Sequence, residues 1–316
     1  MATKVVSLVR QWLVLQLLLV SALAAEIIFY VWLFITLPEH GWHLAAVLLL
    51  VVVIASCWRL SHAAGSATVS GVIRFWQGRR DVGMVKAFTI EFVSRLISFN
   101  VTQPFVQWVM PHEPMLESDA TPVLLVHGYF CNRGIWATFC ARLRNAESMP
   151  IYTYTFSPPF GKIETFAVQL HARIEAICKA TGQTKIILIA HSMGGLVVRK
   201  YMLAHGHARV ARLITIGSPH HGTMLAYFGI GKCAQQMRPN SRWLQALAVG
   251  EYKQLMPPTT AIYTINDDVS YPPESSSLAW ATNIAVRRVG HVGLLFSAEV
   301  AAIVLTLLAP DKNKTL

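Results

Sequence analysis

The stretch of residues 187–196 reads Ile-Leu-Ile-Ala-His-Ser-Met-Gly-Gly-Leu, and it constrains the fold more than any other part of the chain. Its apolar start is typical of a buried strand, and the residues after Ser192 are typical of a helix. A serine on a sharp strand-to-helix turn needs small residues two positions before and two positions after it. Ala190 and Gly194 stand at those positions. We therefore predict that Ser192 is a nucleophile presented at the end of a strand.

Short apolar segments alternate with helical segments through the second half of the chain. Short apolar strands separated by helices are typical of a parallel sheet with both faces covered. We therefore predict an α/β fold with a mostly parallel sheet, in a catalytic domain of residues 118–316. The expected strands are residues 122–126, 151–156, 185–190, 212–216, 261–265 and 282–289, and the expected helices include residues 134–145, 164–181 and 193–205.

Two apolar runs open the chain, which is 54% hydrophobic and 14% charged. The first run begins at Trp12 and the second at Leu44, with a short turn between them. A helix that crosses a membrane needs about 20 mostly apolar residues. We therefore predict a transmembrane helical hairpin in residues 1–60, with helices at about 11–37 and 43–60.

The first apolar run also resembles a cleavable secretory signal. Lys4 and Arg10 precede it, and residues 21–25 are small enough for a cleavage site. The apolar run continues through residues 27–34, however, which favours an uncleaved anchor. Basic residues lie before the first run and after the second, so the positive-inside rule places both ends of the hairpin in the cytoplasm.

Residues 61–117 are interpreted as an amphipathic segment followed by a proline-punctuated linker. The stretch 84–99 places apolar side chains on one helical face and leaves polar ones to the other faces. Such a helix either lies in a membrane interface or packs against the catalytic domain. The apolar face comprises Val85, Phe88, Phe92, Leu96 and Phe99, and the polar side chains are those of Lys86, Glu91, Ser94, Arg95 and Ser98.

The charge and the cysteines narrow the choice of partners and cofactors. The net charge is +11, but no run of Lys and Arg is longer than a pair, which argues against a nucleic acid and favours the bilayer surface as partner. The five cysteines include no CxxC pair. The side chains of the adjacent His220 and His221 diverge, so they do not suggest a metal site. We therefore predict no metal and no cofactor.

A nucleophilic serine needs a histidine as base and an acid that orients this histidine. Residues 260–269 form an apolar strand that ends in two carboxylates, Asp267 and Asp268. His291 stands further along, in a loop ahead of a helix. We predict a catalytic triad of Ser192, Asp267 and His291. Asp267 is preferred because it lies closer to the end of the strand, and Asp268 is the alternative acid.

Two backbone N–H groups are candidates for an oxyanion hole. One donor is expected to be the N–H of the residue after the nucleophile, which is Met193. The other is expected in the loop after an early strand. The strand at 123–126 is followed by His127 and Gly128, so the N–H of Tyr129 is predicted to be the second donor.

Five blocks of this sequence resemble the small bacterial triacylglycerol lipases and esterases of the α/β-hydrolase superfamily. Ala190 replaces the more usual glycine of that superfamily, but lipases of the Bacillus type also read Ala-His-Ser-Met-Gly-Gly. The resemblance implies an α/β-hydrolase fold and supports Asp267 and His291 in their roles. The first 117 residues have no counterpart in the minimal secreted lipases, so they are interpreted as an added membrane anchor. The five blocks are residues 124–129, 190–195, 217–223, 266–269 and 290–297.

The sequence therefore predicts a membrane-anchored serine hydrolase that cleaves fatty-acyl esters, with lipids or other acyl esters as substrates. The predicted location is the bacterial inner membrane, as a multi-pass protein with its catalytic domain on the cytoplasmic face. A phospholipase, a lysophospholipase or an acyltransferase with the same triad is the alternative, and a catalytically silent membrane scaffold is a more distant one. Residues 224–258 either form a mobile lid or simply connect two strands.

Overall fold

The computed structural model describes residues 83–110, 117–146, 150–251 and 256–309, all within one compact unit of the chain. The predicted transmembrane hairpin of residues 1–60 lies outside the described residues.

The predicted multi-pass location in the inner membrane, with a cytoplasmic catalytic domain, is wrong. Within the described ranges, no helix combines the length and the apolar character that crossing a membrane requires. The longest helix of these ranges is α6 (Ile163–Thr181), and it shows the physical reason. It carries Glu164, Arg173, Glu175 and Lys179, which a membrane interior does not accommodate without large cost.

Six strands form one sheet in the order β2-β1-β3-β4-β5-β6, and every neighbouring pair is parallel. This confirms the predicted parallel α/β sheet. The central strands are apolar and buried, as expected for a parallel sheet that is covered on both faces. The strands are β1 (Val123–Val126), β2 (Ile151–Thr153), β3 (Ile186–His191), β4 (Val210–Ile216), β5 (Thr259–Thr264) and β6 (Thr282–Val286).

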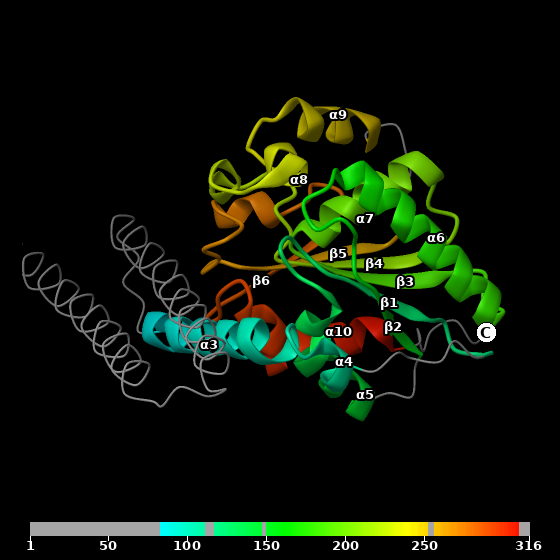
Figure 1. Ribbon diagram of the computed structural model, residues 1–316, viewed down its shortest axis with the longest axis horizontal. Helices are drawn as coiled ribbons and strands as arrows, with labels where there is room; N and C mark the ends of the chain where they lie inside the picture. The colour runs from blue at the N-terminus through cyan, green and yellow to red at the C-terminus, as the bar shows by residue number, and fades with distance from the viewer. Residues whose placement is uncertain (1–82, 111–116, 147–149, 252–255, 310–316) are drawn as a thin grey trace, which may run out of the picture. The chain divides into compact units, whose positions relative to one another are not determined.

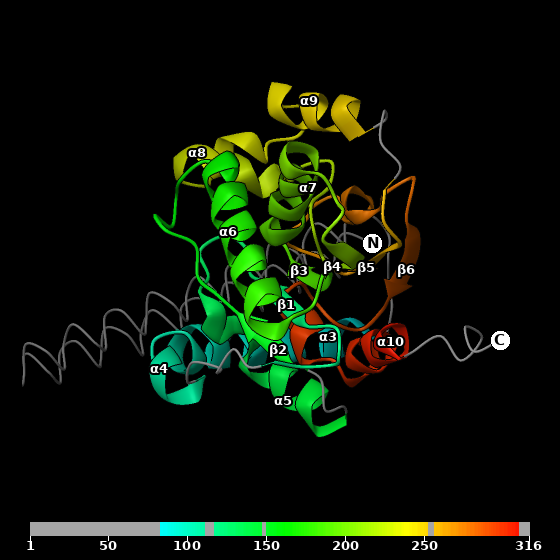
Figure 2. The same cartoon turned by 90° about the vertical axis from the view of Figure 1, so that its right-hand side faces the viewer.

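Helices cover both faces of the sheet (Figure 1). One layer contains α6, α7 (Met193–His205), α8 (Gly231–Gln236) and α9 (Arg242–Glu251). The opposite layer contains α3 (Gly83–Ile97), α4 (Val106–Val109), α5 (Ala137–Ala146) and α10 (Ala298–Leu308). The same two layers are visible from the side (Figure 2). Each layer has its own hydrophobic core against the sheet.

Helix α6 illustrates how the sequence forms these layers. Its buried side chains recur every three or four residues, which places them on the single face that meets the sheet. The helix ends at Gly182, whose φ of 74° is a left-handed conformation that favours glycine. The buried side chains include Phe166, Leu170, Ile174 and Ile177.

The carboxyl ends of the parallel strands bring distant parts of the chain to one edge of the sheet. The loop after β1 contains Tyr129, Ser192 follows β3, Asp267 lies beyond β5, and His291 lies beyond β6. Ligand sites of open α/β sheets lie at this edge, so the topology alone gathers the predicted site residues there.

Candidate active site

Ser192 occupies the junction between β3 and α7 in a strained backbone conformation. Its φ is 55° and its ψ is −130°, a region that residues with a side chain rarely adopt. Strain of this kind costs about 1–3 kcal/mol and persists only where the surroundings impose it. The Ser192 N–H donates to the carbonyl of Ile216 at 3.0 Å, which ties the turn to the neighbouring strand β4.

Gly194 makes this turn possible because the backbone of β1 lies directly against it. A Cβ atom at this position would be 2.4 Å from the carbonyl oxygen of Val126 and 2.7 Å from that of His127. Real Cβ atoms essentially never come so close to backbone, so a larger residue would push the strand and the helix apart. The small residue that the sequence pattern requires is therefore explained by this close packing.

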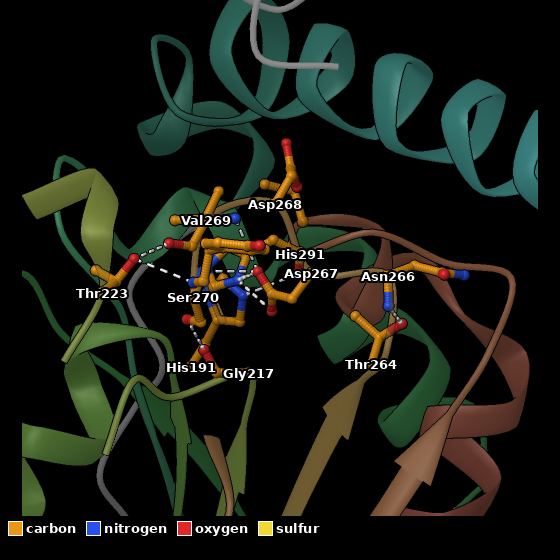
Figure 3. Close-up of polar contacts among 12 residues, drawn as sticks. His191, Gly217, Thr223, Thr264, Asn266, Asp267, Asp268, Val269, Ser270 and His291 are labelled. Carbon is orange, nitrogen blue, oxygen red and sulfur yellow. Dashed lines mark hydrogen bonds and ion pairs between the residues drawn. The ribbon is translucent and has the colours of Figure 1, made fainter. Parts of the chain in front are cut away.

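Asp267 and His291 form a hydrogen-bonded pair (Figure 3). The His291 Nδ1 lies 2.9 Å from Asp267 Oδ2 and 3.0 Å from Asp267 Oδ1. The backbone N–H groups of Val269 and Ser270 also donate to Asp267 Oδ1, at 2.9 and 2.7 Å. An ionised carboxylate only accepts hydrogen bonds, so Nδ1 carries the proton and Nε2 is left as the basic atom of the ring.

Asp268 has a different partner from its neighbour. The Arg95 guanidinium on α3 donates to Asp268 Oδ2 at 2.6 Å. The Asp268 side chain points away from His291 and toward that helix (Figure 3). Of the two candidate acids, Asp267 is therefore the one whose carboxylate contacts the histidine.

The surroundings of His291 favour its charged form. Burial alone would lower the pKa of this histidine, but the charge and the hydrogen bond of Asp267 outweigh burial. The charges of Glu91 and Asp268 act in the same direction, so the pKa of His291 is raised above its ordinary value. Such a shift is typical of a group that must accept a proton during a reaction.

His191 connects the histidine loop to the nucleophile turn. Its ring packs against that of His291 with the ring centres 4.7 Å apart, and it directly precedes Ser192 in the chain. Burial, followed by the nearby His291, holds the pKa of His191 well below its ordinary value. The neutral ring donates from Nε2 to the His291 carbonyl at 3.2 Å. Among the contacts of the described residues, Ser192 Oγ forms no hydrogen bond with the His291 ring.

The two predicted oxyanion donors belong to residues next to the nucleophile turn, one adjacent in the chain and one in the loop after β1. Met193 is the first residue of α7, and the first N–H groups of a helix have no acceptor within it. Gly128 packs so closely against Ser192 that a Cβ atom there would be 2.6 Å from the Ser192 Cβ. This packing brings the following residue, Tyr129, next to the nucleophile.

His127 contributes to the site, although the sequence pattern assigns this residue no role. Its Nε2 accepts the N–H of Phe156 at 3.1 Å, so its Nδ1 carries the proton and donates to the Gly128 carbonyl at 2.9 Å. Burial lowers the pKa of His127 to about 4, so the ring stays neutral and keeps this arrangement. The position of His127, immediately before Gly128 at a strand end, is the signal that could have identified it.

Residues 224–258, which we interpreted as a lid or a connection, form η3 (Met224–Tyr227), α8 and α9 within the described residues. The loop before α8 is tied to the candidate site, because the Tyr129 hydroxyl accepts from the Ile230 N–H at 2.8 Å and donates to the Ile230 carbonyl at 3.0 Å. The side chains of Phe228 and Ile230 are exposed. The candidate site therefore has an apolar loop beside it.

His220 has internal partners rather than an open coordination site. Its Nε2 lies 3.0 Å from Thr215 Oγ1, and its carbonyl accepts from Arg199 at 2.8 Å. In the part of the chain that the structure describes, no cluster of three or more His, Cys, Asp or Glu side chains could hold a metal ion.

Comparisons with known proteins point to hydrolases. The family model of palmitoyl protein thioesterases matches residues 122–280, which is half of the chain. A triacylglycerol lipase of Pseudarthrobacter phenanthrenivorans is 47% identical over 119 residues, 34% of this chain and 35% of that protein. A triacylglycerol lipase of Burkholderia plantarii is also 47% identical over 119 residues, 34% of this chain and 32% of that protein. The match therefore spans about a third of the length of these relatives.

The fold is shared with solved lipases. The mature form of a Bacillus licheniformis lipase superimposes with a TM-score of 0.55 at 17% identity, over 63% of this chain and 96% of the lipase. The described domain thus has the α/β-hydrolase fold that the sequence motifs predict.

Proposed function

Because the chain belongs to the palmitoyl protein thioesterase family of α/β-hydrolases, we propose that it is a serine hydrolase that cleaves fatty-acyl esters. Ser192 is the nucleophile, His291 is the general base and Asp267 orients the histidine. The single observation that supports this assignment best is the buried Asp267–His291 pair beside a serine in a strained strand-to-helix turn.

The proposed reaction has two steps. The Ser192 Oγ attacks the acyl carbonyl carbon while His291 Nε2 takes the hydroxyl proton, and His291 then returns this proton to the leaving group. The product of this step is an acyl-enzyme on Ser192. Water, activated by the same histidine, then attacks the acyl-enzyme, which releases the fatty acid and regenerates the serine hydroxyl.

Asp267 and the backbone supply the electrostatic part of the mechanism. The Asp267 carboxylate holds Nδ1 and stabilises the imidazolium that forms when Nε2 takes the proton. The N–H groups of Met193 and Tyr129 are proposed to donate to the oxyanion of the tetrahedral intermediate. Such donors each contribute about 10²–10³-fold to the rate in related mechanisms.

Two classes of substrate follow from the comparisons. The lipase relatives favour oxygen esters such as acylglycerols, whereas the name of the family model favours acyl thioesters. Both have the same acyl carbonyl, and only the leaving group differs. A phospholipase or an acyltransferase would use the same triad, and would differ in head group or in acyl acceptor.

The first experiment is labelling of the purified full-length chain with a fluorophosphonate probe, with wild type beside Ser192→Ala and Ser277→Ala. Ser277 is a partly exposed serine whose hydroxyl donates to the Glu274 carbonyl, so its variant is a matched control. We expect labelling of wild type and of Ser277→Ala, and none of Ser192→Ala. The same three proteins are then assayed with a nitrophenyl acyl ester and with the acyl thioester of the same chain.

Loss of labelling and of turnover only in Ser192→Ala supports the proposal. The ratio of kcat/KM for the two substrates then shows whether the enzyme prefers an oxygen ester or a thioester. Labelling that persists in Ser192→Ala would move the nucleophile to another residue. A folded wild type with neither labelling nor turnover would favour the catalytically silent scaffold.

A further inference from the structure

Helix α3 contacts the loop of His291 through polar side chains as well as through the apolar Ile90. Glu91, Ser94, Arg95 and Ser98 are all buried, although the sequence pattern leaves them to the faces away from the apolar stripe. Val93 on the same helix is exposed. A buried carboxylate needs hydrogen bonds or opposite charge, so the partners of Glu91 show what this face contacts.

Two of the partners of Glu91 are the residues that follow the histidine. The Val292 N–H donates to Glu91 Oε1 at 3.1 Å, and the Gly293 N–H donates to Glu91 Oε2 at 2.7 Å. These N–H groups open the short helix η5 (Gly293–Phe296), whose first donors have no acceptor within the helix. Glu91 therefore caps η5 from 201 residues away in the sequence.

Gly290, which precedes His291, packs directly against the Glu91 carboxylate. A Cβ atom at Gly290 would be 2.5 Å from Glu91 Oε2 and 2.7 Å from Glu91 Cδ. A Cβ atom at Gly293 would be 3.2 Å from Glu91 Oε2. The loop of residues 290–293 thus wraps around one carboxyl group, and His291 lies between the two points of contact.

Arg95 joins this contact to the acid loop. Its Nε donates to Glu91 Oε1 at 2.6 Å, and its guanidinium also donates to Asp268 Oδ2 at 2.6 Å. One buried cation on α3 therefore lies between the carboxylate that holds the histidine loop and the aspartate next to Asp267. Both α3 and the histidine loop lie outside the residues that match the family model.

We propose that Glu91 is a positioning residue for His291: its carboxylate fixes the histidine loop, so that the ring stays aligned with Asp267 and with the nucleophile turn. The proposal rests on the role of His291 in the proposed function. Glu91 does not react with substrate; it acts on the reaction through the loop and through its negative charge near the ring.

The negative charge of Glu91 provides a second readout, the pKa of His291, which a merely structural role of Glu91 would not change. The charged or titratable groups around the loop are Glu91 and Arg95 from α3, Asp267 and Asp268 after β5, and His191 at the end of β3. Glu91 is among the groups that raise the pKa of His291, after Asp267. Removal of its charge should lower the pKa of His291, and with it the midpoint of the acid limb of the profile of kcat/KM against pH.

The test compares Glu91→Gln with Glu91→Asp and with Glu299→Gln in the full-length chain. Glutamine keeps the length of the side chain but loses the charge and one acceptor oxygen, so we expect kcat to fall about 10- to 100-fold with little change in KM. The acid midpoint should move to lower pH. Aspartate keeps the charge, so its midpoint should stay near that of wild type even if its shorter side chain lowers kcat. Glu299 is exposed on α10, so Glu299→Gln is a matched control with no expected effect.

Wild-type kcat and an unmoved midpoint in a folded Glu91→Gln would overturn the positioning role, and so would a fall in kcat with an unmoved midpoint. His291→Ala distinguishes the two proposals. If that variant keeps full activity, the proposed triad fails and the role of Glu91 fails with it. If His291→Ala is inactive and Glu91→Gln is normal, only the role of Glu91 fails.

A second measurement tests the same contact from the side of the loop. Gly290→Ala adds a methyl group against the Glu91 carboxylate, whereas in a Glu91→Ala background this obstacle is absent. We expect Gly290→Ala to lower kcat by a larger factor in wild type than in Glu91→Ala. Equal factors in the two backgrounds would show that the loop is not held by Glu91, and would overturn the proposal.

Discussion

At the residue scale, Asp267 and Asp268 are neighbours in sequence but have separate partners. The Asp267 carboxylate contacts His291, and the Asp268 carboxylate contacts Arg95. We expect Asp267→Asn to lower kcat about 10⁴-fold, because an amide at this position favours the wrong tautomer of the histidine. Asp268→Asn should cost far less activity, because the Asp268 carboxylate contacts Arg95 and not His291, and is the last of the three carboxylates that raise the pKa of His291. Steady-state kinetics of both variants, at equal folded fraction by circular dichroism, decides between them, and the reverse order of losses would make Asp268 the acid.

The local sequence predicts the residues that gather at the sheet edge, but not the contacts that hold them. Ser192 is recognisable because the small residues around it are adjacent in the chain, and His291 because a loop and a helix follow it closely. Glu91 could not be found in this way. Its contact with Gly293 spans 202 residues, and a glutamate on a helix is usually exposed to solvent.

At the scale of elements, the apolar runs predict all six strands, and the largest differences in strand bounds occur at the two edges of the sheet. The sequence predicts that β2 extends to residue 156 and β6 to residue 289, but β2 ends at Thr153 and β6 ends at Val286. Each edge strand has only one neighbour to bond with. Beyond β2, the N–H of Phe156 donates to His127 instead of to another strand. Tertiary contacts of this kind are not visible in a local pattern.

One buried ion pair links α7 to α9. Arg199 donates from Nε and NH2 to the two oxygens of Glu251 at 2.7 and 2.6 Å. Glu251→Gln leaves a buried guanidinium without its counter-charge, so we expect the free energy of unfolding in urea to fall by about 3–5 kcal/mol. Glu175→Gln is the matched control, because its pair with Arg209 is partly exposed and should change stability little. Equal effects of the two variants would show that burial does not distinguish the pairs.

At the scale of the whole molecule, burial keeps several histidines neutral on different elements. Burial lowers the pKa of His127 to about 4 and holds the pKa of His191 and His220 well below the ordinary value of 6.5. These residues follow β1, end β3 and follow β4, so their protonation would disturb the sheet edge at several points at once. His291, with its raised pKa, acts in the opposite direction.

These shifts fix the sign of the dependence of stability on pH. Below an ordinary pKa of 6.5, the unfolded chain protonates His127, His191 and His220 while the folded chain does not, so stability falls as the pH decreases. Each such group contributes a slope of about 1.4 kcal/mol per pH unit. The stabilisation from His291 is fully present below pH 6.5 and is lost only as the pH rises from there through its raised pKa, so His291 does not offset the slope below pH 6.5. We expect the free energy of unfolding in urea to decrease between pH 6.5 and about 5, before most carboxylates titrate. In His220→Gln this slope should be smaller, whatever the absolute stability of the variant, whereas an unchanged slope would mean that His220 takes up a proton in the folded chain.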